Sequence, residues 1–134
     1  MNKALYALVF IAMIGSLWAA CDVNLSQSDF PYNATQANKV YCLTENVNAT
    51  TDAFTVNSVN NITLNGQGFA ITSTTSIGIF LDTSDGNTFE NVNVTSLYTN
   101  AILLETSNGN RFDGVTVSGG RISPPHGGNA FWFN

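Results

Sequence analysis

A 23-residue repeat is the feature that most constrains the fold of this chain. Residues 78–96 align on residues 101–119 without a gap, and nine of the 19 aligned positions are identical. The identical pairs are Ile79/Ile102, Leu81/Leu104, Thr83/Thr106, Ser84/Ser107, Gly86/Gly109, Asn87/Asn110, Phe89/Phe112, Val92/Val115 and Val94/Val117. A unit of this length cannot bury its apolar side chains alone, so successive copies must stack on one another as in solenoid proteins.

The apolar pattern inside the repeat predicts β-strands. Ile79 and Leu81, then Phe89, then Val92 and Val94 alternate with polar neighbours, which is the periodicity of a strand. Asp-Gly-Asn and Asn-Gly-Asn clusters separate these runs and indicate turns. Each copy therefore holds three short strands, and we expect each strand to pair in parallel with its counterpart one coil later, about 4.8 Å away.

Stacked coils place equivalent side chains over one another, so Asn87 over Asn110 predicts a polar ladder at a turn. An earlier copy begins at Phe54, and we interpret residues 130–134 (AFWFN) as the first strand of a later copy. Coils are therefore expected over residues 54–134, preceded by an N-terminal cap segment over residues 21–53. The apolar run at residues 131–133 would leave the last coil open. We interpret the chain as the N-terminal part of a longer β-solenoid. Self-association through the open end is the alternative.

Residues 1–20 have the plan of a secretory signal peptide. Lys3 precedes the uncharged run Ala4–Ala20, which ends in small residues. This run is near the lower length limit for a spanning helix, so an uncleaved anchor is one alternative. Lipid attachment at Cys21 is another. The length of the run and its flanking residues favour a cleaved signal, so we expect a secreted or cell-surface protein.

Export makes the cysteines informative. Cys21 and Cys42 are the only two, and an even number in an oxidising compartment predicts a disulfide between them. The alternative is a lipidated Cys21 and a buried, free Cys42.

The composition argues against nucleic acid as a partner. Lys and Arg number only 4, without a basic run, whereas phosphate neutralisation needs such residues. Charged residues make up 10% of the chain against about 25% in an ordinary domain, and 18 Asn, 15 Thr and 11 Ser take their place. Contact with a membrane is expected only through residues 1–20, if they are not cleaved.

Residues 40–134 resemble right-handed parallel β-helix proteins. The resemblance rests on Val40–Leu43 (VYCL), on residues 61–68 (NITLNGQG) and on the repeated Gly-Ile-Phe-Leu…Asn-Thr-Phe-Glu-Asn-Val pattern. The chain is most similar to exported repeat proteins often labelled NosD-like, within the pectate-lyase-like superfold. This implies an all-β, right-handed parallel β-helix of about 23 residues per coil. It leaves the function open, because lyases, hydrolases, adhesins and surface-layer modules share this architecture.

Two acidic residues form the weak candidate for a metal site. Asp82 should stack on Glu105, with Asn57 before the pair and Asn134 after it. Ca²⁺ takes six or more oxygen ligands, and Asp85 is the only further charge nearby. A solvated rim is therefore the simpler interpretation, and we expect no bound metal or cofactor.

The basic residues and the single histidine do not complete an active site. Arg111 and Arg121 lack the neighbouring Lys and Asp cluster that resemblance to a lyase requires, and the polygalacturonase-like motifs are absent. His126 lies in an inserted Pro-Pro-His-Gly-Gly segment without a carboxylate or second imidazole nearby, so we interpret it as part of a loop. The protein is expected to lack catalysis of its own. The alternative is the N-terminal fragment of a polysaccharide lyase or glycoside hydrolase with catalytic coils beyond residue 134.

An outward stripe gives the better hint of function. If Ile79 and Leu81 point inward, the residue between them points outward. In successive coils this position holds Thr55, Phe80, Leu103 and Trp132. Exposed apolar columns mark either a binding surface or a face that another segment covers; the opposite alternation would place the stripe in the core. We predict a structural, adhesion or carbohydrate-binding module whose partner is a glycan or cell-wall polymer.

Overall fold

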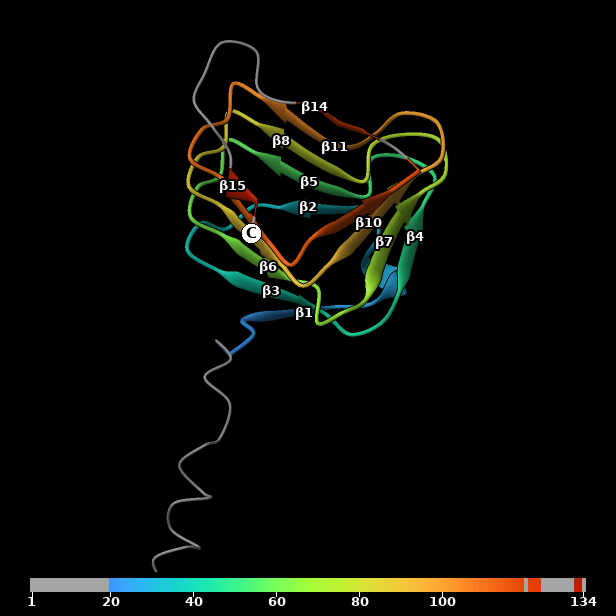
Figure 1. Ribbon diagram of the computed structural model, residues 1–134. Helices are drawn as coiled ribbons and strands as arrows, with labels where there is room; N and C mark the ends of the chain where they lie inside the picture. The colour runs from blue at the N-terminus through green and yellow to red at the C-terminus, as the bar shows by residue number, and fades with distance from the viewer. Residues whose placement is uncertain (1–19, 120, 124–131, 134) are drawn as a thin grey trace, which may run out of the picture.

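The chain winds into a parallel β-solenoid, as the repeat predicts (Figure 1). The computed structural model describes residues 20–119, 121–123 and 132–133. In this part of the chain the structure is all-β except for one short 3₁₀ helix, and the coils make about four turns. The predicted fold class is therefore confirmed at the level of a parallel β-solenoid.

Three parallel sheets, here named A, B and C, enclose the core as the sides of a triangle (Figure 1). Sheet A contains β1 (Val23–Leu25), β3 (Val40–Leu43), β6 (Thr63–Asn65), β9 (Thr88–Glu90), β12 (Arg111–Asp113) and β15 (Trp132–Phe133). Sheet B contains β2 (Tyr32–Ala34), β5 (Phe54–Asn57), β8 (Ile79–Asp82), β11 (Asn100–Glu105) and β14 (Arg121–Ser123). Sheet C contains β4 (Val47–Ala49), β7 (Ala70–Ser73), β10 (Asn93–Ser96) and β13 (Thr116–Ser118).

Equivalent apolar side chains form columns inside the triangle. Ile79 pairs with Ile102 in adjacent strands, and both side chains are fully buried. The rings of Phe89 and Phe112 stack with centroids 5.1 Å apart. Phe54, one coil earlier, pairs with Ile79. Phe54 and Ile79 lie farther apart in the sequence than Ile79 and Ile102 do, which makes the early coils harder to align by sequence. Their strands nevertheless pair in the same way.

The segment expected as an N-terminal cap also takes part in the coils. Its strands pair as the later strands do, with Val23 opposite Tyr41 and Tyr32 opposite Phe54. Parallel pairing therefore begins at Val23, well before the predicted start of the coils at residue 54.

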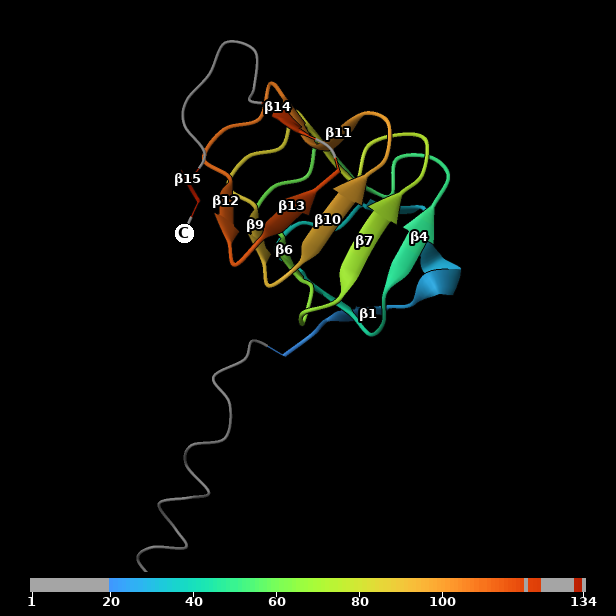
Figure 2. The same ribbon diagram turned by 45° about the vertical axis from the view of Figure 1, so that its right-hand side comes forward.

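A short 3₁₀ helix, η1 (Gln27–Asp29), closes the edge of sheet C beside β4 (Figure 2). The Gln27 side chain binds both backbone groups of Asn48: its Nε2 donates to the Asn48 carbonyl at 2.8 Å, and its Oε1 accepts from the Asn48 N–H at 2.6 Å. A side-chain amide thus takes the place of a neighbouring strand, which covers an edge that would otherwise be open for pairing.

A disulfide and the Asp22 carboxylate join this first coil to the next one. Cys21 and Cys42 are joined, as predicted. Asp22 accepts a hydrogen bond from the Val40 N–H at 2.8 Å, and this bond, with Lys39 nearby, holds the pKa of Asp22 below its ordinary value.

Asp29, at the end of η1, is stabilised as a carboxylate in a similar way. It accepts hydrogen bonds from the Ser26 N–H at 2.8 Å and from the Ser26 hydroxyl at 2.9 Å. Both bonds favour the charged form and lower the pKa of Asp29.

Candidate functional site

The outer stripe lies on the outer face of sheet B. Thr55 pairs with Phe80, and Phe80 pairs with Leu103, so the three side chains form one column. Their neighbours Ile79 and Leu81 are buried, whereas the three stripe residues are partly exposed. The column continues toward the N-terminus at Asn33 of β2, which pairs with Thr55 and which the sequence alignment missed.

The structure corrects the expected fourth member of the outer stripe. The strand that follows β11 in sheet B is β14, and Leu103 pairs with Ser123. Trp132 lies in sheet A, where β15 pairs with β12 and Trp132 is opposite Arg111. Residues 121–123 are therefore the first strand of this coil, and the inserted segment follows that strand instead of preceding it. The outer stripe therefore consists of Asn33, Thr55, Phe80 and Leu103.

A column of hydrogen-bond acceptors runs beside the outer stripe. Asn57, Asp82 and Glu105 are in register with one another. Each lies two residues beyond a stripe residue on the same strand, hence on the same face and roughly 6.6 Å away. Asp82 accepts a hydrogen bond from the adjacent Thr83 hydroxyl at 2.9 Å. The outer face of sheet B therefore combines an apolar column with an acidic and amide column, here called the acceptor column.

The structure brings Asp82 and Glu105 together but does not build a metal site around them. In residues 20–119, 121–123 and 132–133, no group of three or more His, Cys, Asp or Glu side chains is placed to hold an ion. Asn134 and His126 lie outside the described residues. Arg111 binds Asp113 of its own strand at 2.6 Å.

A buried asparagine ladder supports the turns next to the acceptor column. The Asn87 N–H donates to Asn110 Oδ1 at 2.8 Å, and Asn87 Oδ1 accepts from the Ile62 N–H at 3.0 Å. Both asparagine side chains are fully buried. Asn110 Nδ2 donates to the Ser84 carbonyl at 3.0 Å. These bonds fix each turn to the next coil, and they thereby fix the spacing of the residues at the ends of β5, β8 and β11.

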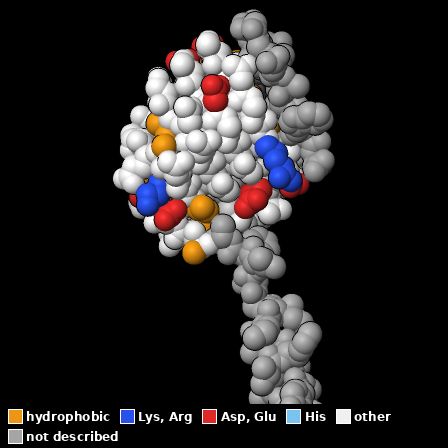
Figure 3. All heavy atoms as spheres, turned by 90° about the vertical axis from the view of Figure 1, so that its left-hand side faces the viewer, with side chains coloured by type: hydrophobic (Ala, Val, Ile, Leu, Met, Phe, Trp, Pro, Cys, Tyr) orange, Lys and Arg blue, Asp and Glu red, His pale blue; other side chains and the backbone are white. Residues whose placement is uncertain are grey.

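The surface over these turns is mainly uncharged. Figure 3 shows the left-hand side of Figure 1, where the chain passes from sheet B to sheet A, and only a few acidic and basic side chains interrupt the white surface. Such a surface agrees with the high content of Asn, Thr and Ser.

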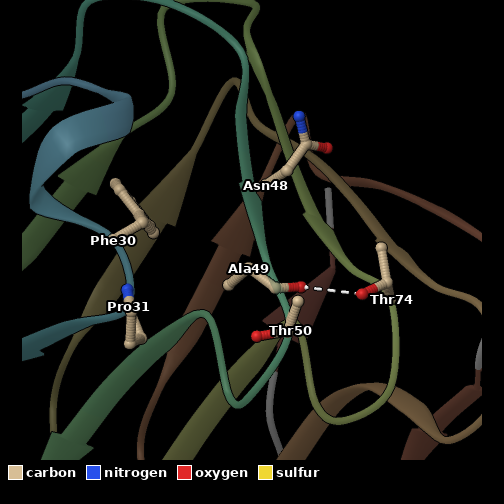
Figure 4. A pocket seen from close by; sticks show the side chains of 6 residues that line it. All are labelled: Phe30, Pro31, Asn48, Ala49, Thr50 and Thr74. Carbon is tan, nitrogen blue, oxygen red and sulfur yellow. Dashed lines mark hydrogen bonds between the residues drawn. The ribbon is translucent and has the colours of Figure 1, made fainter.

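A pocket that the sequence did not predict lies at the corner between sheets C and B. It has a volume of about 200 Å³ and is lined by Phe30, Pro31, Asn48, Ala49, Thr50 and Thr74. Phe30 and Pro31 lie on one side, and Ala49, Thr50 and Thr74 lie on the other (Figure 4). The lining residues come from separate coils, so no short motif could have identified them. The Thr-rich turns of the early coils are the only signal in the sequence.

Searches of protein-family profiles, of curated proteins and of solved structures found no match. None of the described residues belongs to a helix that is long and apolar enough to cross a membrane. The strand pairing therefore identifies the fold, and the outer face of sheet B and the corner pocket are the candidate functional surfaces.

Proposed function

We propose that the protein is an exported, non-catalytic β-helix module that adsorbs to a glycan or cell-wall polymer through the outer face of sheet B. Within this proposal it belongs with the NosD-like repeat proteins of the pectate-lyase-like superfold. The observation that carries the proposal is the outer stripe, in which the partly exposed Phe80 and Leu103 lie side by side.

The chemistry of the two columns suits a sugar chain. Sugar rings present C–H faces, which pack on aromatic and aliphatic side chains, and hydroxyl groups, which donate to carboxylate and amide oxygens. Phe80 and Leu103 offer the first kind of contact, and Asp82 and Glu105 offer the second. The rigid strands keep both columns in place before binding, so little ordering cost is added when a ligand arrives.

Export is supported by the disulfide between Cys21 and Cys42, because such bonds persist mainly in oxidising compartments. We expect the mature protein to begin at Ala20 or Cys21 and to appear in the medium or on the cell surface. Mass spectrometry of the N-terminal peptide tests this. A protein recovered from cells only with residues 1–19 attached would contradict a cleaved signal.

Binding is tested with Phe80→Thr, which shortens the stripe but keeps a residue suited to a strand. The matched control is Thr88→Ala, because Thr88 lies in the same coil, is also partly exposed, and is on sheet A. The assay is depletion of the full chain from solution by insoluble cellulose, chitin, xylan and pectin. We expect binding to at least one polymer, a roughly tenfold weaker affinity for Phe80→Thr, and no change for the control. Equal binding by both variants would refute a role for the stripe.

A further inference from the structure

We propose a second binding site, at the corner between sheets C and B, for the end of a neutral oligosaccharide. One sugar ring occupies the pocket between Phe30 and Thr74, and the next ring packs on Tyr98. This site lies apart from the outer stripe and goes beyond the proposed function.

The pocket has the size and lining for one small polar ring. Its volume of about 200 Å³ is below the roughly 300–1,000 Å³ typical of drug-sized ligands. Phe30 and Pro31 supply an apolar wall, and Asn48, Thr50 and Thr74 supply an amide and two hydroxyls. Among the described residues, neither the Thr50 hydroxyl nor the Asn48 carboxamide has a protein hydrogen-bond partner. Both groups are therefore available to a ligand.

The strand register places two exposed side chains in line with the residues that line this pocket. Ala49 pairs with Ser73, and Ser73 pairs with Ser96. The residues that follow them, Thr50, Thr74 and Leu97, therefore form a row across the corner, with about 4.8 Å between coils.

This row ends at the most exposed large hydrophobic side chains of the described residues. Leu97 is 54% exposed and Tyr98 is 80% exposed. The Leu97 N–H donates to the Ser73 carbonyl at 3.2 Å, which fixes this turn to the turn that carries Thr74. Tyr98 lies one coil beyond Thr74, and an exposed aromatic ring at this position offers a stacking surface for a second sugar ring.

The charges around the corner favour a neutral ligand over an anionic one. None of the six lining residues is charged. Asp52, the acidic residue of the turn that contains Thr50, is held by the Ser76 hydroxyl and by the Ile77 N–H at 3.1 Å. The chain carries a net charge of −5, so a uronate would meet repulsion without a cation to offset it.

The test is an NMR titration of the full chain with neutral tetrasaccharides of gluco, galacto, manno and xylo configuration, and with tetragalacturonate as the anionic probe. We expect saturable shifts of the amides at residues 48–50, 74 and 97–98 with a neutral probe, and weaker binding of tetragalacturonate. Tyr98→Ala and Thr50→Val should each weaken binding about threefold to tenfold. Phe80→Thr should leave the affinity at this corner unchanged.

The outcomes separate this site from the outer stripe. The corner site is overturned if no neutral probe gives saturable shifts there, if tetragalacturonate binds as tightly, or if Tyr98→Ala and Thr50→Val bind as the wild type does. Loss of binding with Phe80→Thr alone would support the stripe and overturn the corner. Loss with the corner variants alone would do the reverse.

Discussion

Removal of the Asn87 side chain tests whether the buried ladder holds the coils together. In Asn87→Ala the Ile62 N–H loses its acceptor in a fully buried position, and the Val59 carbonyl loses a weaker contact of 3.5 Å. A buried unsatisfied polar group costs about 1–3 kcal/mol. With the small cavity added, we expect a loss of about 2–4 kcal/mol in the free energy of unfolding.

The matched control makes the same kind of bond at the surface. Asn60 Oδ1 accepts from the Asp85 N–H at 2.7 Å, again between successive coils, but Asn60 is exposed. Water replaces its carboxamide in Asn60→Ala, so we expect a loss of only about 0.5–1 kcal/mol. Urea unfolding followed by circular dichroism measures both losses, and the expected midpoint shift for Asn87→Ala is roughly 1–2 M. Equal midpoints for the two variants would refute the argument from burial.

Asn87→Asp adds a pH-dependent test of the same site. The variant keeps the oxygen that accepts from Ile62 but places a charged oxygen where Asn87 has its Nδ2 donor. Burial raises the pKa of a carboxyl group, so the folded variant binds a proton more readily than the unfolded one. Its deficit in stability relative to the wild type should be largest at pH 7 and should shrink as the pH falls toward 4. A deficit that is constant over this range would contradict a buried carboxylate at this position.

Three further predictions concern the close approach of two coils, the disulfide and the acidic residue next to it. Gly78→Ala should lower the free energy of unfolding by about 2–3 kcal/mol, because the new Cβ would lie 2.6 Å from a carbonyl oxygen of the next coil. The control Gly68→Ala should cost only about 1 kcal/mol, because its Cβ meets no atom within 4 Å and only the left-handed backbone is unfavourable. Similar urea midpoints for the two variants would count against the steric argument. Reduction of Cys21–Cys42 should lower the free energy of unfolding by about 3 kcal/mol, and a midpoint insensitive to dithiothreitol would contradict this. The lowered pKa of Asp22 stabilises the fold at neutral pH and ceases to do so as the pH falls below about 4, so the advantage of the wild type over Asp22→Asn should vanish in acid.

The later coils could be predicted from the sequence because their repeat has no gap. Ile79 and Ile102 occupy the same position of the ungapped repeat, and an alignment finds such a pair at once. Phe54 and Ile79 also pair, but the sequence between them is longer, and the sequence between Tyr32 and Phe54 is shorter. Turns of varying length change the repeat spacing in the early coils while the strands stay paired. The sequence repeat therefore predicted the first coil at residue 54, whereas strand pairing begins at Val23.

The error at Trp132 has a similar origin. The short strand at residues 121–123 has no conspicuous apolar alternation. The strongly apolar run at 131–133 was therefore interpreted as the strand that follows β11 in sheet B. The corner pocket was missed for another reason. Phe30, Thr50 and Thr74 come from different coils, and only the folded corner brings them together.

The pairing of each strand with neighbours only one coil away has a mechanical consequence. A pull on the two ends would peel one coil at a time from the stack, because each described strand pairs only with strands one coil away. Each released coil of about 23 residues adds roughly 80 Å of extended chain. The 21-residue separation between Cys21 and Cys42 would be withheld from that extension by the disulfide. A solenoid of this kind would yield to tension in small steps and lengthen while its remaining coils stay folded.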